Sequence, residues 1–215
     1  MPRFPGYGVL RRLVQLGLLL ALTAAAPAPP KKLVWAFGDS LTAGLGLPPD
    51  QGYVPQLQRA LRQAGVDAEV RNGGVSGDTA AQGRARLLWG LRGLGQKPDL
   101  VLLELGANDM LRGLPTGQIA SNLDRILTEL KRRQIPVLIM GMRAAPNLGA
   151  DYRGAFESIY PRLAKRYGMP LYPFFLDGVA GNRALIQADG LHPNAKGVAI
   201  VVRKTLPAVR AGLGR

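Results

Sequence analysis

The sequence predicts an α/β fold in which an open parallel sheet is covered by helices on both faces. Short apolar segments alternate five times with segments of helical periodicity, and this alternation is typical of parallel sheets. Two of the apolar segments are nearly continuous, as expected for strands buried on both faces. A chain of 215 residues with 47% hydrophobic residues is sufficient for one domain with a full core.

Five segments are the candidate strands. Residues 99–106 and 136–142 are the near-continuous apolar runs. Residues 66–72 alternate between apolar and polar side chains, which favours a position nearer an edge of the sheet. The other two candidates are residues 32–37 and 170–175.

Apolar residues spaced three and four apart predict a helix after each strand, and we expect these stripes to face the core. They are Val54, Leu57 and Leu61; Leu87, Leu88, Leu91 and Leu94; Ile119, Leu123, Ile126, Leu127 and Leu130; Phe156, Ile159, Tyr160, Leu163 and Tyr167; and Val198, Val202, Leu206 and Val209. The sequence shows no internal repeat, so residues 29–215 are expected to form a single domain.

Residues 1–28 are predicted to be a signal peptide and the start of a linker. Residues 1–12 carry three arginines and no acid, and residues 13–26 are uncharged. A basic start, a short apolar run and a small-residue end describe an export signal, and the apolar run is shorter than the roughly 20 residues of a membrane span. An uncleaved anchor is the alternative. Export would place the protein in a bacterial periplasm or the medium.

The chain is strongly basic, with a formal net charge of +14. Such a charge fits nucleic acid or an anionic surface, but the basic residues are scattered and lack the aromatic interleaving of a nucleic-acid platform. We therefore expect a monomer with no nucleic-acid partner, and transient contact with membrane lipid stays open. The absence of cysteine excludes disulfides, thiol catalysis and Cys-type zinc sites.

Polar residues follow the strands at the edge where parallel sheets bind ligands. Ser40 follows the first strand in the segment GDSLTAG, and Asp189 and His192 lie in DGLHP. His192 is the only histidine, so it must be the base if an imidazole activates a serine, and Asp189 could then orient its ring. Turns and helix caps would explain each of these residues equally simply. Asp39 is interpreted as a residue that orients the turn, not as a catalytic acid.

A serine hydrolase also needs hydrogen-bond donors for the oxyanion of the tetrahedral intermediate. The backbone N–H groups of Ser40 and Gly77 and the side-chain amide of Asn108 are the candidates, although Gly77 and Asn108 also suit ordinary turns. The G-x-S-x-G elbow of the α/β-hydrolases is absent from the sequence. Its absence argues against that fold and not against serine chemistry.

Four segments, GDSLTAG, NGGVSGDT, GANDML and DGLHP, occur in the order and at roughly the spacing of the sequence blocks of the GDSL, or SGNH, hydrolases. The chain resembles this family from residue 33 to about residue 210. The segments DMLRGLP and RAAPNLGADY resemble its branch of arylesterases, acyl-CoA thioesterase I and lysophospholipase L1 enzymes. Gly74 is a difference, since many relatives carry serine there.

The resemblance implies a flavodoxin-like three-layer α/β/α sandwich with a five-stranded parallel sheet. It also implies that Ser40 is the nucleophile, that Asp189 and His192 complete the triad, and that Ser40, Gly77 and Asn108 bind the oxyanion. Neither a metal nor a cofactor is expected. The implied reaction is hydrolysis of a small-molecule acyl ester or thioester.

The acyl chain is expected to lie along two loops, although surface packing would explain their apolar residues equally well. These residues are Met110, Leu111, Leu114, Pro146 and Leu148. One alternative function is a carbohydrate O-acetylesterase of the same family, and another is a non-catalytic lipid- or glycan-binding protein on this fold. A flavodoxin-like cofactor binder is disfavoured because GDSLTAG lacks a phosphate-cradling glycine pattern.

Overall fold

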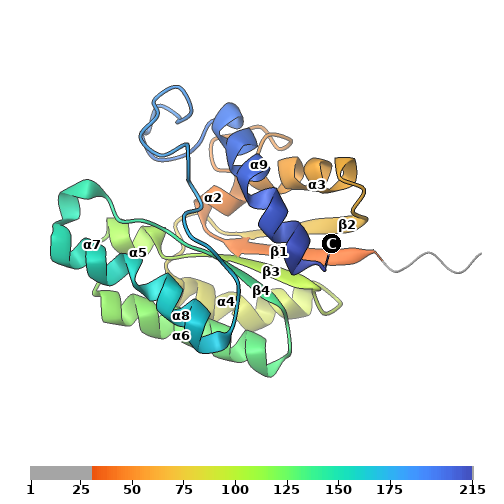
Figure 1. Cartoon of the computed structure of the whole chain (residues 1–215), viewed down its shortest axis with the longest axis horizontal. Coiled ribbons are helices and arrows are strands. Elements are labelled where there is room, and N and C mark those ends of the chain that lie inside the picture. The colour runs from red at the N-terminus through yellow and green to blue at the C-terminus, as the bar shows by residue number, and fades with distance from the viewer. Residues whose placement is uncertain (1–30, 215) are drawn as a thin grey trace, which may run out of the picture. The chain divides into compact units, whose positions relative to one another are not determined.

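A computed structural model describes residues 31–214, so the predicted signal peptide lies outside the described residues. Its five strands form one sheet with the order β2-β1-β3-β4-β5 (Figure 1). They are β1 (Lys32–Gly38), β2 (Ala68–Gly74), β3 (Leu100–Glu104), β4 (Val137–Met140) and β5 (Leu171–Tyr172). All pairings are parallel. The predicted α/β class and its five-stranded parallel sheet are confirmed.

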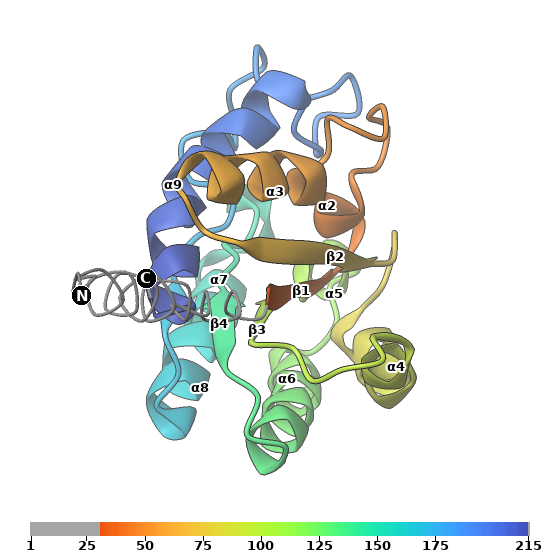
Figure 2. The same cartoon turned by 90° about the vertical axis from the view of Figure 1, so that its right-hand side faces the viewer.

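Helices cover both faces of the sheet, which gives three layers. Figure 2 shows α3 (Tyr53–Gln63) and α9 (Ala195–Gly212) on one face, with α4 (Ala80–Gly93), α6 (Thr116–Arg132) and α8 (Ile159–Tyr167) on the other. The predicted helix around residues 156–167 is divided, because α7 (Ala150–Glu157) ends one residue before α8 begins. In residues 31–214 no helix is both long and apolar enough to cross a membrane.

Three short elements at the carboxyl ends of the strands escaped the periodicity analysis. They are α2 (Ser40–Ala43), α5 (Ala107–Leu111) and the 3-10 helix η1 (Pro146–Leu148). Each is too short to show a repeated apolar spacing. Because they follow β1, β3 and β4 directly, they place their side chains at the edge of the sheet where a ligand binds.

The observed strands differ in extent from the predicted ones, and β2 and β5 show the reasons most clearly. The strand predicted at 66–72 starts later, because the N–H of Val66 still bonds to the last turn of α3. The strand predicted at 170–175 shortens to two residues, because Pro173 has no N–H to continue the ladder. The residues after β5 therefore leave the sheet and lie along its carboxyl edge.

The apolar stripe predicted for α4 is wrong in part. The helix buries Ala80, Gly83 and Leu87, whereas Leu88 is 42% exposed. A side chain at Gly83 would collide with Leu105, so small residues bring α4 close to the sheet. Leu87 and Leu94 are buried and Leu91 packs against the core, so the predicted stripe fails only at Leu88. Glycine carries no hydrophobic signal, and the contribution of Gly83 to the buried face was therefore not predicted.

Candidate active site

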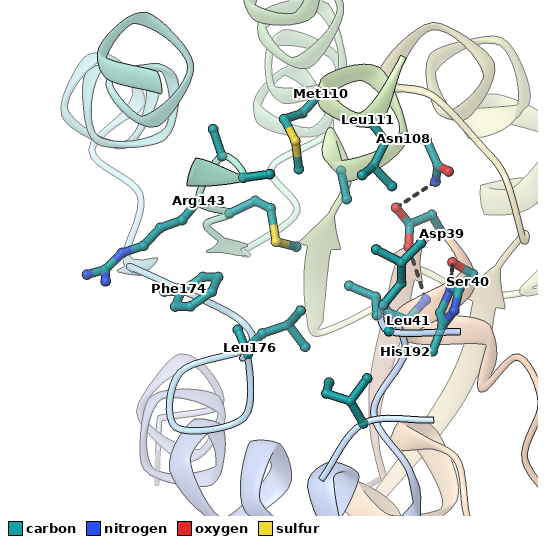
Figure 3. Close-up of a pocket in the computed structure, with 18 of the residues that line it drawn as sticks. Asp39, Ser40, Leu41, Asn108, Met110, Leu111, Arg143, Phe174, Leu176 and His192 are labelled. Atoms are coloured by element: carbon teal, nitrogen blue, oxygen red, sulfur yellow. Dashed lines mark hydrogen bonds between the residues drawn. The ribbon is translucent and has the colours of Figure 1, made fainter. Parts of the chain in front are cut away.

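Three side chains from the two ends of the chain meet at the carboxyl edge of the sheet. The Oγ atom of Ser40 lies 2.8 Å from Nε2 of His192. On the other side of the ring, Nδ1 of His192 lies 2.6 Å from Oδ2 of Asp189. Figure 3 shows Ser40 and His192 facing each other. A base at this distance can take the hydroxyl proton, and the carboxylate can stabilise the resulting imidazolium.

The turn after β1 fixes the position of Ser40. Asp39 caps α2, with its Oδ1 accepting a hydrogen bond from the N–H of Leu41 at 3.0 Å. Gly38 is needed before it, because a Cβ atom there would lie 2.6 Å from the carbonyl oxygen of Glu104. This geometry supports the interpretation of Asp39 as a residue that orients the turn.

The loop before α9 fixes the acid and the base together. Oδ1 of Asp189 accepts hydrogen bonds from the N–H groups of Leu191 at 2.9 Å and His192 at 3.0 Å. These two bonds and the bond to the His192 ring lower the pKa of Asp189 to about 2. The carboxylate therefore stays ionised at neutral pH, with its second oxygen held against the ring.

Two of the predicted oxyanion donors are the backbone N–H groups of Ser40 and Gly77. Ser40, Gly77 and His192 line the same cavity. Gly77 has a φ of +85°, which a residue with a side chain would adopt only under strain. Within residues 31–214, neither the N–H of Ser40 nor that of Gly77 donates a hydrogen bond. Both are thus available to an oxygen of a substrate.

The third predicted donor, the amide of Asn108, is already held by the protein. Its Nδ2 donates to Oδ2 of Asp39 at 3.0 Å and to the carbonyl oxygen of Asp78 at 3.1 Å. Because an amide nitrogen has two hydrogens, Asn108 can bind an oxyanion only by sharing one of these bonds. The same two bonds orient the amide before a substrate arrives.

Asn108→Ala is expected to lower kcat by about 10²–10³, as for other oxyanion donors. Steady-state hydrolysis of an acyl ester measures the loss. Asn122→Ala is a matched control, because the Asn122 amide bonds only to Gln118 within α6, away from the cavity. A loss below about tenfold for Asn108→Ala would remove Asn108 from the oxyanion-binding role.

A second buried carboxyl group lies under the nucleophile turn. Oε2 of Glu104 accepts hydrogen bonds from the N–H of Asp39 at 3.3 Å and from Oγ1 of Thr42 at 2.9 Å. Both carboxyl groups are buried, and the charge of Asp39 raises the pKa of Glu104, so we expect the pair to hold one proton. Glu104 was not predicted, and its only signal is that it interrupts the otherwise apolar residues 100–106.

The pair of carboxyl groups holds this proton on Glu104. Burial raises the pKa of Asp39 to about 6. Burial and the neighbouring Asp39 charge raise the pKa of Glu104 well above its usual range. In the described residues, Oε1 of Glu104 has no hydrogen-bond partner, and a charged carboxylate with an unpartnered buried oxygen would be costly. Asp39 is therefore the ionised member at neutral pH.

Glu104→Gln should keep kcat within about threefold, because glutamine has the shape and donor of the protonated acid. Glu104→Ala should cost about 2–4 kcal/mol in the free energy of unfolding, because it leaves a cavity and unpaired buried groups. Denaturant unfolding with activity assays measures both. A Gln variant as unstable as the Ala variant would contradict a protonated Glu104.

The pH dependence of the free energy of unfolding is a second test of the protonation of Asp39 and Glu104. Both folded-state pKa values are raised, so the pair stabilises the fold fully below the unfolded pKa of about 4. This stability is lost as the pH rises through the pKa of Asp39 at about 6. We expect a shallower loss in Glu104→Gln, measured by urea unfolding across this range. An unchanged slope would show that Glu104 does not hold the proton.

A cavity of about 450 Å³ opens beside Ser40 and His192. Of the predicted acyl-chain residues, Met110, Leu111 and Pro146 line it. Leu114 and Leu148 are not among the lining residues and pack against the core instead. The structure therefore brings three of the five predicted side chains to the cavity.

Sequence analysis missed much of the apolar lining. The additional large apolar residues are Leu41, Leu45, Met142, Phe174, Leu176, Ile186 and Leu191. Most of them follow the carboxyl ends of β1, β4 and β5, so the position of ligands in parallel sheets was the signal that could have found them. Arg143 lies at the end of the cavity away from Ser40, with its guanidinium 5.1 Å from the centre of the Phe174 ring (Figure 3).

Comparisons with known proteins cover the whole site. The sequence model of the GDSL-like lipase/acylhydrolase family matches residues 36–200. An arylesterase of Vibrio mimicus is 43% identical over 182 residues, which are 85% of this chain and 89% of the relative. Thioesterase 1/protease 1/lysophospholipase L1 of Escherichia coli K12 is 39% identical over 176 residues, which are 82% of this chain and 81% of the relative.

A solved structure agrees with these matches. The crystal structure of AlinE4, an SGNH-hydrolase family esterase, is 49% identical and superimposes with a TM-score of 0.74. The match covers 86% of this chain and 98% of that one. The range matched by the family model contains every candidate residue of the triad and the oxyanion site.

Proposed function

Because this chain belongs to the GDSL-like lipase/acylhydrolase family, we propose that it hydrolyses carboxylic esters and thioesters through a Ser40–His192–Asp189 triad and an acyl-enzyme. Its esterase and thioesterase relatives make it a hydrolase of ester bonds. The observation that carries the mechanism is the 2.8 Å approach of Ser40 Oγ to His192 Nε2, beside an apolar cavity.

The first half of the reaction acylates Ser40. Nε2 of His192 takes the hydroxyl proton as Ser40 Oγ forms a bond to the carbonyl carbon, and the carbonyl electron pair moves to the oxygen. The N–H groups of Ser40 and Gly77 and the amide of Asn108 bind this oxyanion. When the tetrahedral intermediate collapses, the bond to the alcohol or thiol breaks, and His192 protonates the leaving group.

The second half releases the acid. His192 takes a proton from water, whose oxygen attacks the acyl carbon, and collapse returns the proton to Ser40 Oγ. Asp189 holds the ring in one tautomer throughout and balances its positive charge. Every step uses groups of this chain, so the proposal needs neither a metal nor a cofactor.

The cavity favours acyl chains longer than acetyl. Met110, Met142 and Phe174 give it a large apolar lining, which gains little free energy from a two-carbon group. An acetylesterase for carbohydrates would instead need polar groups for a sugar. The proposed partner is therefore a small-molecule ester or thioester with an apolar acyl chain, and transient contact with membrane lipid would supply such esters.

We also propose that the protein is exported and acts as a monomer. β1 begins at Lys32, so cleavage of the proposed signal peptide at residues 1–28 would leave every described strand and helix intact. Mass spectrometry of the protein recovered after expression of the full sequence tests this. A retained N-terminus would favour the uncleaved anchor.

The substrate proposal is tested with p-nitrophenyl esters from acetyl to palmitoyl, with Ser40→Ala as the reference. We expect Ser40-dependent hydrolysis that continues into medium or long chains. Activity confined to acetyl would favour the carbohydrate O-acetylesterase. No Ser40-dependent activity at any length would favour the non-catalytic lipid- or glycan-binding protein.

A further inference from the structure

The outer face of α4 carries large apolar side chains that neither the core nor the candidate site uses. Trp89 is 73% exposed, the highest value among the exposed large hydrophobic residues of the described chain, and its neighbour Leu88 is 42% exposed. Neither residue lines the cavity beside Ser40. Figure 2 shows α4 at the margin of its layer, next to α6.

The fold does not explain a tryptophan at this position. α4 meets the sheet through Gly83, Leu87 and Gly90, and a Cβ atom at Gly90 would lie only 2.7 Å from the ring of Trp35. The inner face is therefore closely packed without any help from the outer one. A polar residue at position 89 would serve the helix as well and would not place an indole ring in water.

Positive charge borders these apolar side chains. Arg84, Leu88 and Arg92 are spaced four residues apart, so they share one face of the helix, with Trp89 beside them. All four residues are exposed. We call them the α4 face. In the part of the chain that the structure describes, neither Arg84 nor Arg92 makes an ion pair.

No acidic side chain offsets this charge along the helix. Residues 80–98 contain no aspartate or glutamate. The acid immediately before α4, Asp78, pairs with Arg86, and on β2 Glu69 pairs with Arg71. The α4 face is thus apolar at its centre and positive at both ends, and its complement is an apolar surface with negative charge.

We propose that the α4 face docks on a membrane surface that contains anionic phospholipid. An indole ring is favoured at the level of the headgroups, because its apolar body and polar N–H suit that interface. Arginines beside it would reach the lipid phosphates.

Docking by this face would hold the protein at the surface that contains lipid-borne esters. Thr79, which caps the N-terminus of α4, comes two residues after Gly77 in the sequence, so the docking helix starts from the proposed oxyanion loop. The benefit to catalysis rests on the proposed esterase function, whereas the binding itself does not. The two are therefore tested separately.

The intrinsic fluorescence of the protein reports the docking directly. The chain has two tryptophans, and Trp35 is 2% exposed whereas Trp89 is 73% exposed. We would titrate the protein, recovered after expression of the full sequence, with vesicles of phosphatidylglycerol and phosphatidylcholine. The expected result is a blue shift of the emission and quenching by brominated lipid. Residues 1–30 contain no tryptophan, so they do not contribute to this signal.

Co-sedimentation with the same vesicles assigns the binding to the α4 face. Trp89→Ala should weaken it by about tenfold or more. Arg84→Ala with Arg92→Ala should weaken it by about thirtyfold at low salt. The control is Arg203→Ala with Arg210→Ala, which removes the same charge from exposed positions of α9, on the opposite face of the sheet. The control should bind as the wild type does.

Three results would overturn the proposal. Bound protein with an unshifted emission would show that another surface docks. Equal losses in the two arginine pairs would show attraction by net charge alone. A self-association or nucleic-acid binding that Trp89→Ala abolishes, without vesicle binding, would assign the face to another partner. Ser40→Ala should bind vesicles as the wild type does. Trp89→Ala should hydrolyse a short soluble ester at about the wild-type rate. The two variants therefore distinguish a failure of the docking proposal from a failure of the esterase proposal.

Discussion

Ser40→Ala is expected to lower kcat for ester hydrolysis by about 10⁴–10⁶ and to leave the fold intact. The substitution removes the only oxygen that His192 Nε2 contacts at 2.8 Å, so no acyl-enzyme can form. The oxyanion donors remain and supply a small residual rate by binding alone. The stability should change little, because the hydroxyl makes no other hydrogen bond in the described chain.

The measurement is a steady-state assay of purified wild type and variant with a medium-chain p-nitrophenyl ester. Ser121→Ala provides the matched control, because Ser121 lies exposed on α6, outside the cavity. A mass shift of Ser40 by a phosphonate ester, absent from the variant, would identify the nucleophile. Residual activity above about one hundredth of the wild type would place the nucleophile elsewhere.

Asp189→Asn is expected to lower kcat by about 10²–10⁴, the second largest loss at the site. The amide oxygen would keep the bonds to the N–H groups of Leu191 and His192, which leaves the amide NH₂ facing Nδ1 of the ring. Nδ1 must then accept, so the ring proton moves to Nε2, which can no longer take the proton of Ser40. The imidazolium also loses its counter-charge.

The control for this variant is Asp177→Asn, since Asp177 pairs only with exposed Lys204. The pH dependence of the free energy of unfolding is an independent test of the Asp189 carboxylate. The pKa of Asp189 is lowered in the fold to about 2, so its contribution is present above the unfolded pKa of about 4 and is lost as the pH falls. The destabilisation of Asp189→Asn should therefore shrink towards pH 2. A kcat within about tenfold of the wild type would contradict the proposed triad.

The centre of the sheet was predictable because β1, β3 and β4 are buried on both faces. β3 and β4 read as continuous apolar runs, and the stripe of α6 from Ile119 to Leu130 is buried as predicted. The sequence was misleading where packing depends on the absence of side chains. At α4, glycines bring the helix close to the sheet, so Leu88 turns to solvent although its spacing suits the core.

The candidate site was predictable where the sequence contains only one residue of the required type. A single histidine leaves one candidate for the proposed base, and Asp189, three residues earlier, lies within hydrogen-bond distance of its ring. Glu104 was not predicted, because its contact with the turn that carries Ser40 is formed only in the folded chain. No pattern in the sequence indicates that contact. Met142 and Phe174 escaped because the residues near strand ends look like core in sequence, and only the fold shows that they open onto a cavity.

The separation of the nucleophile from its base sets the order in which activity arises during folding. Ser40 and His192 are 152 positions apart, and His192 is held on the loop that leads into the last helix. Closing so long a loop costs entropy that only late tertiary contacts repay. If Ser40 and His192 act as proposed, a chain still being synthesised is expected to have an inert serine until the loop that carries His192 has reached it. The rate at which activity returns during refolding would therefore report when His192 reaches Ser40.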